Sequence, residues 1–158
     1  MKAAIDSVSL IFILKVPELR KLVISYFEKI YVTEFVYREV FESKVSEEIV
    51  QIDKTKLFFK RKNPKKILQT KLGRGELETI SLALEEKLMF ISEDQKAVLF
   101  ATSIGIKTAS ILSILIKARE DGKIGKKNVR DILFKLVENG LYISSDVFSV
   151  VLGRLEMD

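Results

Sequence analysis

Two carboxylates stand directly after apolar stretches that are typical of buried strands. Asp6 follows Ala3–Ile5, and Asp94, preceded by Glu93, follows Leu88–Ile91. Sites in parallel α/β sheets lie outside the carboxyl ends of the strands, so we expect these acids to meet at one edge of a sheet. Each also has a purely structural interpretation, because an acidic residue before a helix caps its first turn.

Two glutamates are expected to join these acids from predicted helices. Glu39 lies between Val36 and Val40, at the border of the apolar face of its helix. Glu76 is in the first turn of another helix and can point inward as well. Glu78 follows two residues later, and residues i and i+2 do not share a helix face. We therefore predict that Glu78 faces solvent.

The absence of two residue types narrows the chemistry that these acids can support. The chain contains no His and no Cys, which excludes zinc sites, a Ser–His–Asp triad and thiol nucleophiles. Converging carboxylates raise one another's pKa unless a cation supplies the missing charge. Mg²⁺ or Mn²⁺ suits an all-oxygen site with open positions for water and phosphate. Such a metal activates water and stabilises charge on a phosphoryl centre.

Short apolar strands alternate with helices along the chain. We expect strands at 3–6, 30–32, 57–59, 88–91 and 105–108, and helices at 7–15, 17–28, 34–43, 76–87, 93–103, 110–120, 126–138 and 146–156. This order predicts an α/β fold in three layers, with a short parallel sheet flanked by helices. The length of 158 residues predicts a single domain spanning 1–158.

The positive charge is concentrated in one segment of the chain. Residues 54–74 hold nine Lys or Arg and no acid, although the whole chain carries a net charge of only +5. A basic strip on an otherwise acidic body is typical of a surface that binds a phosphate backbone. A solvated loop is the alternative. Phe58 and Phe59 either stack on bases or belong to the core of a short strand.

Several stretches together carry a resemblance to a known family. They occur in the right order, at 5–7, 36–40, 75–83 and 90–94, with a matching tail from Gly105 to Leu152. In these stretches the chain resembles the PIN-domain family of metal-dependent ribonucleases. It is most similar to compact prokaryotic members related to the toxins of toxin–antitoxin pairs. The likeness extends over nearly the whole chain.

The resemblance implies a Mg²⁺- or Mn²⁺-dependent endoribonuclease that cleaves single-stranded RNA. It implies four metal ligands with catalytic roles: Asp6, Glu39, Glu76 and Asp94. Ser7 and Glu93 would support them. The candidate contacts to RNA in the basic strip are Lys60, Arg61, Lys62, Lys65, Lys66 and Arg74. A homodimer and a small antitoxin protein are the expected partners, and no membrane is expected.

Three positions depart from the pattern of the subgroup. Thr33 stands where Pro is frequent, Val98 where Arg is frequent, and Glu93 where the first Asp of a pair is usual. The alternative function is therefore a catalytically inactive PIN-fold module that binds RNA or protein. The longest uncharged apolar stretch near the N-terminus, 7–14, is too short to span a membrane, so we expect a cytoplasmic protein. Abundant Lys and Glu with few Asn and Gln favour a thermophilic source.

Other phosphate chemistries fit the sequence less well. A phosphatase of the haloacid dehalogenase type needs a second Asp two residues after the first, where this chain has Val8. A dinucleotide-binding loop would need a third glycine after Gly73 and Gly75. The acids in the following turn would also repel a pyrophosphate.

Overall fold

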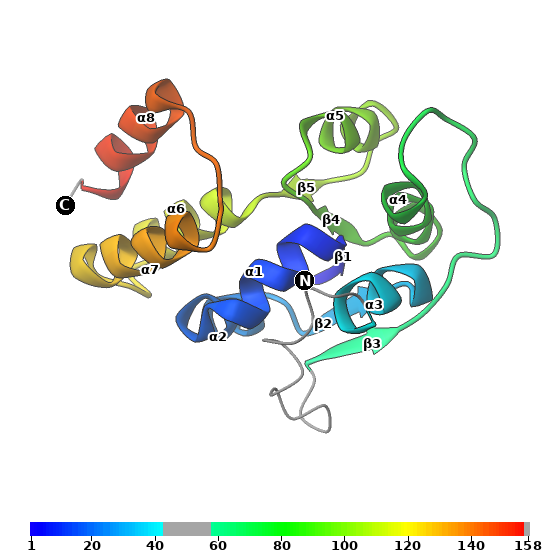
Figure 1. Ribbon diagram of the computed structural model, residues 1–158, viewed down its shortest axis with the longest axis horizontal. Helices are drawn as coiled ribbons and strands as arrows, with labels where there is room; N and C mark the ends of the chain where they lie inside the picture. Colours follow the sequence, from blue (N-terminus) through cyan, green and yellow to red (C-terminus); the bar gives the residue numbers. More distant parts are fainter. Residues whose placement is uncertain (43–57, 157–158) are drawn as a thin grey trace.

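The computed structural model describes residues 1–42 and 58–156 (Figure 1). The described residues form five strands and eight helices, in this order: β1 (Lys2–Ile5), α1 (Ser7–Lys15), α2 (Pro17–Tyr26), β2 (Lys29–Val32), α3 (Glu34–Phe41), β3 (Phe59–Arg61), α4 (Arg74–Glu86), β4 (Met89–Ile91), α5 (Gln95–Ser103), β5 (Thr108–Ala109), α6 (Ile111–Glu120), α7 (Lys126–Glu138) and α8 (Ser145–Leu155). None of these helices is long and apolar enough to cross a membrane.

The strands form one parallel sheet in the order β3-β2-β1-β4-β5. The first strand of the chain therefore lies at the centre, and β4 is its direct neighbour. Ile5, the last residue of β1, is paired with Ile91, the last residue of β4. The amide of Asp6 continues this pairing and donates to the carbonyl oxygen of Ile91 at 3.2 Å. The chain thus leaves both strands at the same edge of the sheet.

Alternation of side chains along the strands builds a core on each face of the sheet. Ala3, Ile5 and Ile91 are buried in a cluster with residues of α1, α2, α3 and α6. Ala4 and Phe90 point to the opposite face and pack against residues of α4 and α5. The predicted three-layer α/β fold with a parallel sheet is therefore confirmed.

The last two helices lie at one end of the molecule, away from α3 and α4 (Figure 1). They pack against each other through Val129 and Leu133 of α7 and through Val151 and Leu155 of α8. The C-terminal part of the chain thus adds a helical layer beside α6 rather than another unit of the sheet.

Several predicted boundaries differ from the observed ones. The third strand was expected at 57–59, but β3 covers Phe59–Arg61, and residue 57 lies outside the described part of the chain. β3 pairs only with β2, so its exposed basic side chains occupy an edge strand with one solvent-facing side. The fifth strand starts at Thr108 rather than at 105. The end of the third predicted helix, residue 43, also lies outside the described residues.

Candidate functional site

A cleft of about 250 Å³ opens at the edge of the sheet where β1 and β4 end. It is lined by Asp6, Ser7, Val8, Glu39, Gly75, Glu76, Glu93 and Asp94. All four predicted metal ligands and both predicted supporting residues therefore share one cleft. No Lys or Arg belongs to its described lining.

Asp6 is a buried carboxylate that caps α1. Its Oδ1 accepts a hydrogen bond from the amide of Ser9 at 2.9 Å. Burial raises the pKa of Asp6, and the nearby negative charge of Asp94 adds to this effect, while a hydrogen bond with Ser92 opposes it. The charged form of Asp6 is thus fixed in place but poorly compensated.

Asp94 occupies the equivalent position after β4, and it is exposed. Its Oδ1 accepts from the amide of Ala97 at 2.9 Å and so caps α5. Its own amide donates to the hydroxyl oxygen of Ser92 at 3.0 Å. The capping interpretation is therefore correct for both aspartates, and the caps hold the two side chains at the wall of the cleft.

Glu93 adds a fifth carboxylate to the cleft. Its Oε1 accepts a hydrogen bond from the amide of Ile111, the first residue of α6, at 2.6 Å. Burial raises the pKa of Glu93 to about 7, and the negative charge of Asp6 contributes to the rise, while the bond from Ile111 opposes it. The residue thus connects the cleft with the start of α6.

Glu39 and Glu76 reach the cleft from two helices that approach closely at Gly75. A Cβ atom on Gly75 would lie 3.1 Å from Oε1 of Glu39 and 3.3 Å from the ring of Phe35. A side chain at this position would require the Glu39 carboxylate and the Phe35 ring to shift by a few tenths of an ångström. From the sequence, Gly75 was visible only as part of a helix start. Its role in packing depends on the contact with α3, which the structure shows.

The donor set of the cleft fits a hard divalent cation. Its charged groups are all carboxylates, and oxygen ligands are those that Mg²⁺ and Mn²⁺ prefer. Three helices, α1, α4 and α5, begin beside the cleft, and their positive ends offset part of the repulsion between the acids. Among residues 1–42 and 58–156, no three carboxylates are close enough together to enclose an ion as they stand.

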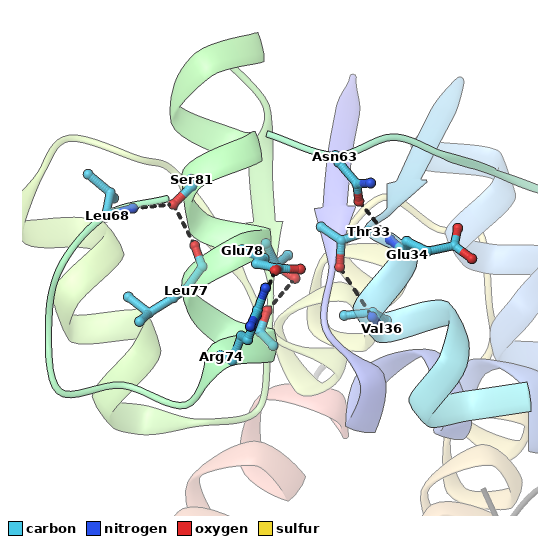
Figure 2. A network of polar contacts seen from close by, with 11 residues as sticks. Thr33, Glu34, Val36, Asn63, Leu68, Arg74, Leu77, Glu78 and Ser81 are labelled. Carbon is cyan, nitrogen blue, oxygen red and sulfur yellow. Dashed lines mark hydrogen bonds and ion pairs between the residues drawn. The ribbon is translucent and has the colours of Figure 1, made fainter. Parts of the chain in front are cut away.

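The prediction that Glu78 faces solvent is wrong. Glu78 is buried, and its Oε1 accepts a hydrogen bond from Nε of Arg74 at 3.0 Å. The segment 62–73 covers this side of α4, where the amide of Leu68 donates to Oγ of Ser81 at 2.9 Å (Figure 2). Glu76 and Glu78 do lie on different faces of the helix, but the second face is covered by this segment rather than by water.

The basic strip is partly paired with the acids around it. Arg61 pairs with Glu34 at 3.5 Å, Lys62 with Glu86 at 2.8 Å and Arg74 with Glu78 at 3.0 Å. The other three predicted RNA contacts, Lys60, Lys65 and Lys66, are exposed and form no ion pair with the described residues. Lys54 and Lys56 lie outside those residues.

The two aromatic residues at the start of β3 belong to the protein's own packing. Phe59 is buried in the core, so it is not free to stack on a base. Phe58 is half-buried and meets the ring of Phe59 edge-on at 5.4 Å. The core interpretation of this pair is thus correct for Phe59.

Comparison with solved structures gives the same fold. The chain is similar to a PilT N-terminus domain protein from the hyperthermophilic archaeon Sulfolobus solfataricus P2, with a TM-score of 0.52 and 18% identity. The match covers 75% of this chain and 93% of the archaeal protein. No curated protein sequence matches the chain.

Family comparison extends over almost the full length of the sequence. The family model of DUF3368, a PIN domain, matches residues 2–157. This range contains every residue that lines the acidic cleft. The chain therefore belongs to the PIN-domain family, whose members are typically nucleases and generally use divalent metal ions.

Proposed function

We propose that the protein is an endoribonuclease that hydrolyses single-stranded RNA with water as the nucleophile and with a divalent cation in the acidic cleft. The observation that carries this proposal is the cleft itself. Five carboxylates from two strand ends and two helices line one space of about 250 Å³, without a basic side chain among them. Acids so arranged favour a cation and the phosphate that it attracts.

Asp6, Glu39, Glu76 and Asp94 would hold the cation, directly or through water molecules. A Mg²⁺ or Mn²⁺ ion bound there activates water and stabilises the negative charge that develops on the scissile phosphate. The two aspartates are held by their bonds to helix amides, so their positions are fixed before any ligand binds. Ser7, in the first turn of α1, adds a polar group to the same wall.

A second groove, of about 340 Å³, supports a path for the RNA backbone next to the cleft. It is lined by Glu34, Phe35, Arg38, Asn63, Pro64, Ile67, Arg74 and Glu78. Figure 2 shows Arg74 and Glu78 of α4 on one side of this region and the start of α3 on the other. The groove and the cleft are neighbours, because Phe35 borders Gly75 of the cleft.

Three exposed lysines offer further positions for phosphates. Lys60, Lys65 and Lys66 have no ion pair with the described residues, so binding a phosphate there breaks no existing bridge. Lys62 and the two arginines would have to exchange a carboxylate for a phosphate. We therefore assign backbone binding mainly to the three lysines. Arg38 and Arg74 of the groove would contribute by exchanging their glutamate partners, Glu34 and Glu78, for a phosphate.

Cleavage of a mixed pool of single-stranded RNA tests this function. We expect cleavage with Mg²⁺ or Mn²⁺, none with a chelator, and none in Asp94→Asn, which keeps the helix cap because Asn caps as well as Asp. Glu138→Gln, at the exposed end of α7, is the matched control and should cleave as the wild type does. A pool of single-stranded DNA tests the choice of sugar.

Two outcomes would overturn the proposal. Cleavage that survives the chelator or the Asp94→Asn substitution would come from another enzyme. RNA binding without any cleavage by the metal-loaded wild type would support the alternative, an inactive PIN-fold binding module. The toxin role, an antitoxin partner and a homodimer stay predictions. A small open reading frame beside the gene, whose product suppresses the activity, would support the first two.

A further inference from the structure

A further groove, of about 500 Å³, adjoins the acidic cleft on the side of α5. It is lined by Ser92, Glu93, Gln95, Val98, Leu99, Ser110, Leu112, Tyr142, Ile143, Ser144 and Val147. Glu93 lines this groove and the acidic cleft alike, so the two spaces adjoin at that residue. The groove is therefore within reach of a nucleotide next to a phosphate in the cleft.

The groove differs from the cleft in its chemistry. Its walls are mainly apolar, and it has no basic residue among its described lining. Tyr142 is 87% exposed and Leu99 70% exposed, so two large apolar side chains stand open to solvent beside a charged site. An aromatic ring so exposed offers a face on which a planar group can stack.

The polar residues of the groove lie where β4 ends and where α5, α6 and α8 begin: Ser92, Glu93, Gln95, Ser110 and Ser144. Oγ of Ser144 accepts from the amide of Val147, and Oγ of Ser110 accepts from the amide of Ser113. Gln95 is exposed at the start of α5. An apolar wall with a small number of polar groups suits a nucleobase, which has an apolar face and a polar edge.

We propose that this groove is a nucleobase subsite in which Tyr142 stacks on the base of a nucleotide next to the scissile phosphate. The inference rests on the proposed nuclease function and specifies how its substrate is held. The phosphate backbone would find its charge partners in a cation bound in the cleft and in the lysines of the basic strip, whereas the mainly apolar groove, without a basic residue in its described lining, suits a base better than a phosphate. Gln95 and Ser144 provide polar atoms for the edge of the base, which makes the groove a source of sequence preference.

The first experiment measures stacking without cleavage. The chain contains no Trp, so Tyr142→Trp introduces one fluorophore into the groove. In the Asp94→Asn background, short oligouridine or oligoadenosine should quench this fluorescence, while an abasic ribose-phosphate oligomer should not. Phe134→Trp, on the exposed face of α7 and 66% exposed in the wild type, is the matched control and should show no quenching.

The second experiment measures the contribution of the ring to cleavage. Stacking of one base on an aromatic ring corresponds to about a tenfold to hundredfold effect, so Tyr142→Ala should lower kcat/KM by that factor. Tyr142→Phe keeps the ring and should retain the wild-type value. Tyr142 is too exposed for either change to disturb the core.

Outcomes of these experiments separate the subsite from the nuclease activity. A wild type that cleaves with metal, together with an unchanged kcat/KM in Tyr142→Ala, would overturn the subsite and leave the nuclease intact. Quenching by the abasic oligomer equal to that by oligouridine would also overturn it. A shift of oligomeric state in Tyr142→Ala with unchanged kcat/KM would assign the groove to a second copy of the chain. A wild type without metal-dependent cleavage would overturn the function itself.

Discussion

In the acidic cleft, carboxylates stand beside one another without a basic side chain in the lining. Along the basic segment 60–74, which is the described part of the basic strip, three of the positive charges pair with acids. Arg61, Lys62 and Arg74 each pair with a glutamate of α3 or α4. In the cleft, by contrast, Asp6 and Glu93 have raised pKa values, and the charge of a neighbouring acid contributes to both shifts.

This difference separates a charged site from a charged surface. Exposed ion pairs contribute about 0–1 kcal/mol each, so those of the basic segment, with α3 and within or onto α4, add little to the stability of the fold. Uncompensated carboxylates work against folding, and a protein that retains them gains when a cation binds. Charge that lacks a partner, rather than charge alone, therefore marks the place where a ligand is expected.

The largest effect that tests this comparison is the loss of cleavage when one cleft acid is neutralised. Asp6→Asn and Asp94→Asn should each reduce kcat by about 1,000-fold or more. Both acids would help to stabilise the same charge, which develops on the scissile phosphate in the transition state. The double variant should be little worse than either single variant. Lys62→Gln removes a paired charge from the basic segment and should change kcat by less than about threefold. Equal losses at Lys62 and Asp94 would contradict the distinction between the two regions.

A second effect is a pH dependence of stability in the metal-free protein. Glu93 has an ordinary pKa of 4.5 and titrates at about 7 when folded, so the folded state binds the extra proton between these values. The free energy of unfolding should therefore fall as pH rises from 4.5 to 7, by on the order of 3 kcal/mol for this group. Urea melts with a chelator, compared between wild type and Glu93→Gln, measure it.

Comparison with Glu93→Gln isolates the effect of Glu93 from that of other acids, whose lowered pKa values give stability the opposite pH dependence. The pKa of Glu18 is lowered because Lys135 favours its charged form, and the pKa of Glu85 is lowered because backbone amides do the same. Both residues therefore stabilise the folded protein more as the pH rises through the acid range. Gln at position 93 keeps an acceptor for the amide of Ile111 but carries no charge. Identical pH profiles of the two proteins would show that Glu93 is charged at little cost.

A third effect is stabilisation by metal. Mn²⁺ at about a hundred times its Kd should stabilise the wild type by roughly 2.7 kcal/mol, or about 5–10 °C in Tm for a chain of this size. Asp94→Asn should lose most of that gain while its metal-free form is at least as stable as the wild type, because one repelling charge is gone. A wild-type Tm that changes with neither Mg²⁺ nor Mn²⁺ would remove the argument for a cation site.

The strand ends of this fold could be predicted from sequence, because local residue types determine them. Apolar runs that stop at Asp6 and at Ser92-Glu93-Asp94 mark both the end of a strand and the cap of the next helix. These patterns are short in sequence, so their interpretation needs no knowledge of distant contacts. The three cleft acids at the strand ends, Asp6, Glu93 and Asp94, were therefore within reach of sequence analysis.

The burial of Glu78 and the groove at Tyr142 could not be predicted in the same way. Both depend on segments far apart in sequence that pack together, such as Leu68 on Ser81, or the segment before α8 beside α5. The pairing of the basic strip has the same origin, because its partner Glu86 lies 24 residues after Lys62. Helical periodicity gives the faces of a helix but not what covers each of them.

The smallest expected effect concerns which lysines of the basic segment contact RNA. Lys65 and Lys66 have no ion pair with the described residues, and their amides, not their ammonium groups, bind Glu85. Changing both to Gln should reduce the slope of log affinity against log salt by about 0.7 per lost contact on single strands, whatever the RNA sequence. Lys62→Gln should change the slope less, because its ammonium is held by Glu86 at 2.8 Å and RNA must compete with that carboxylate. The slopes, measured in the Asp94→Asn background without cleavage, therefore rank the lysines by how readily their ammonium groups contact RNA phosphates. An equal change for Lys62 would mean that the ion pair opens freely in solution and that the whole segment, paired or not, is available to the phosphate backbone.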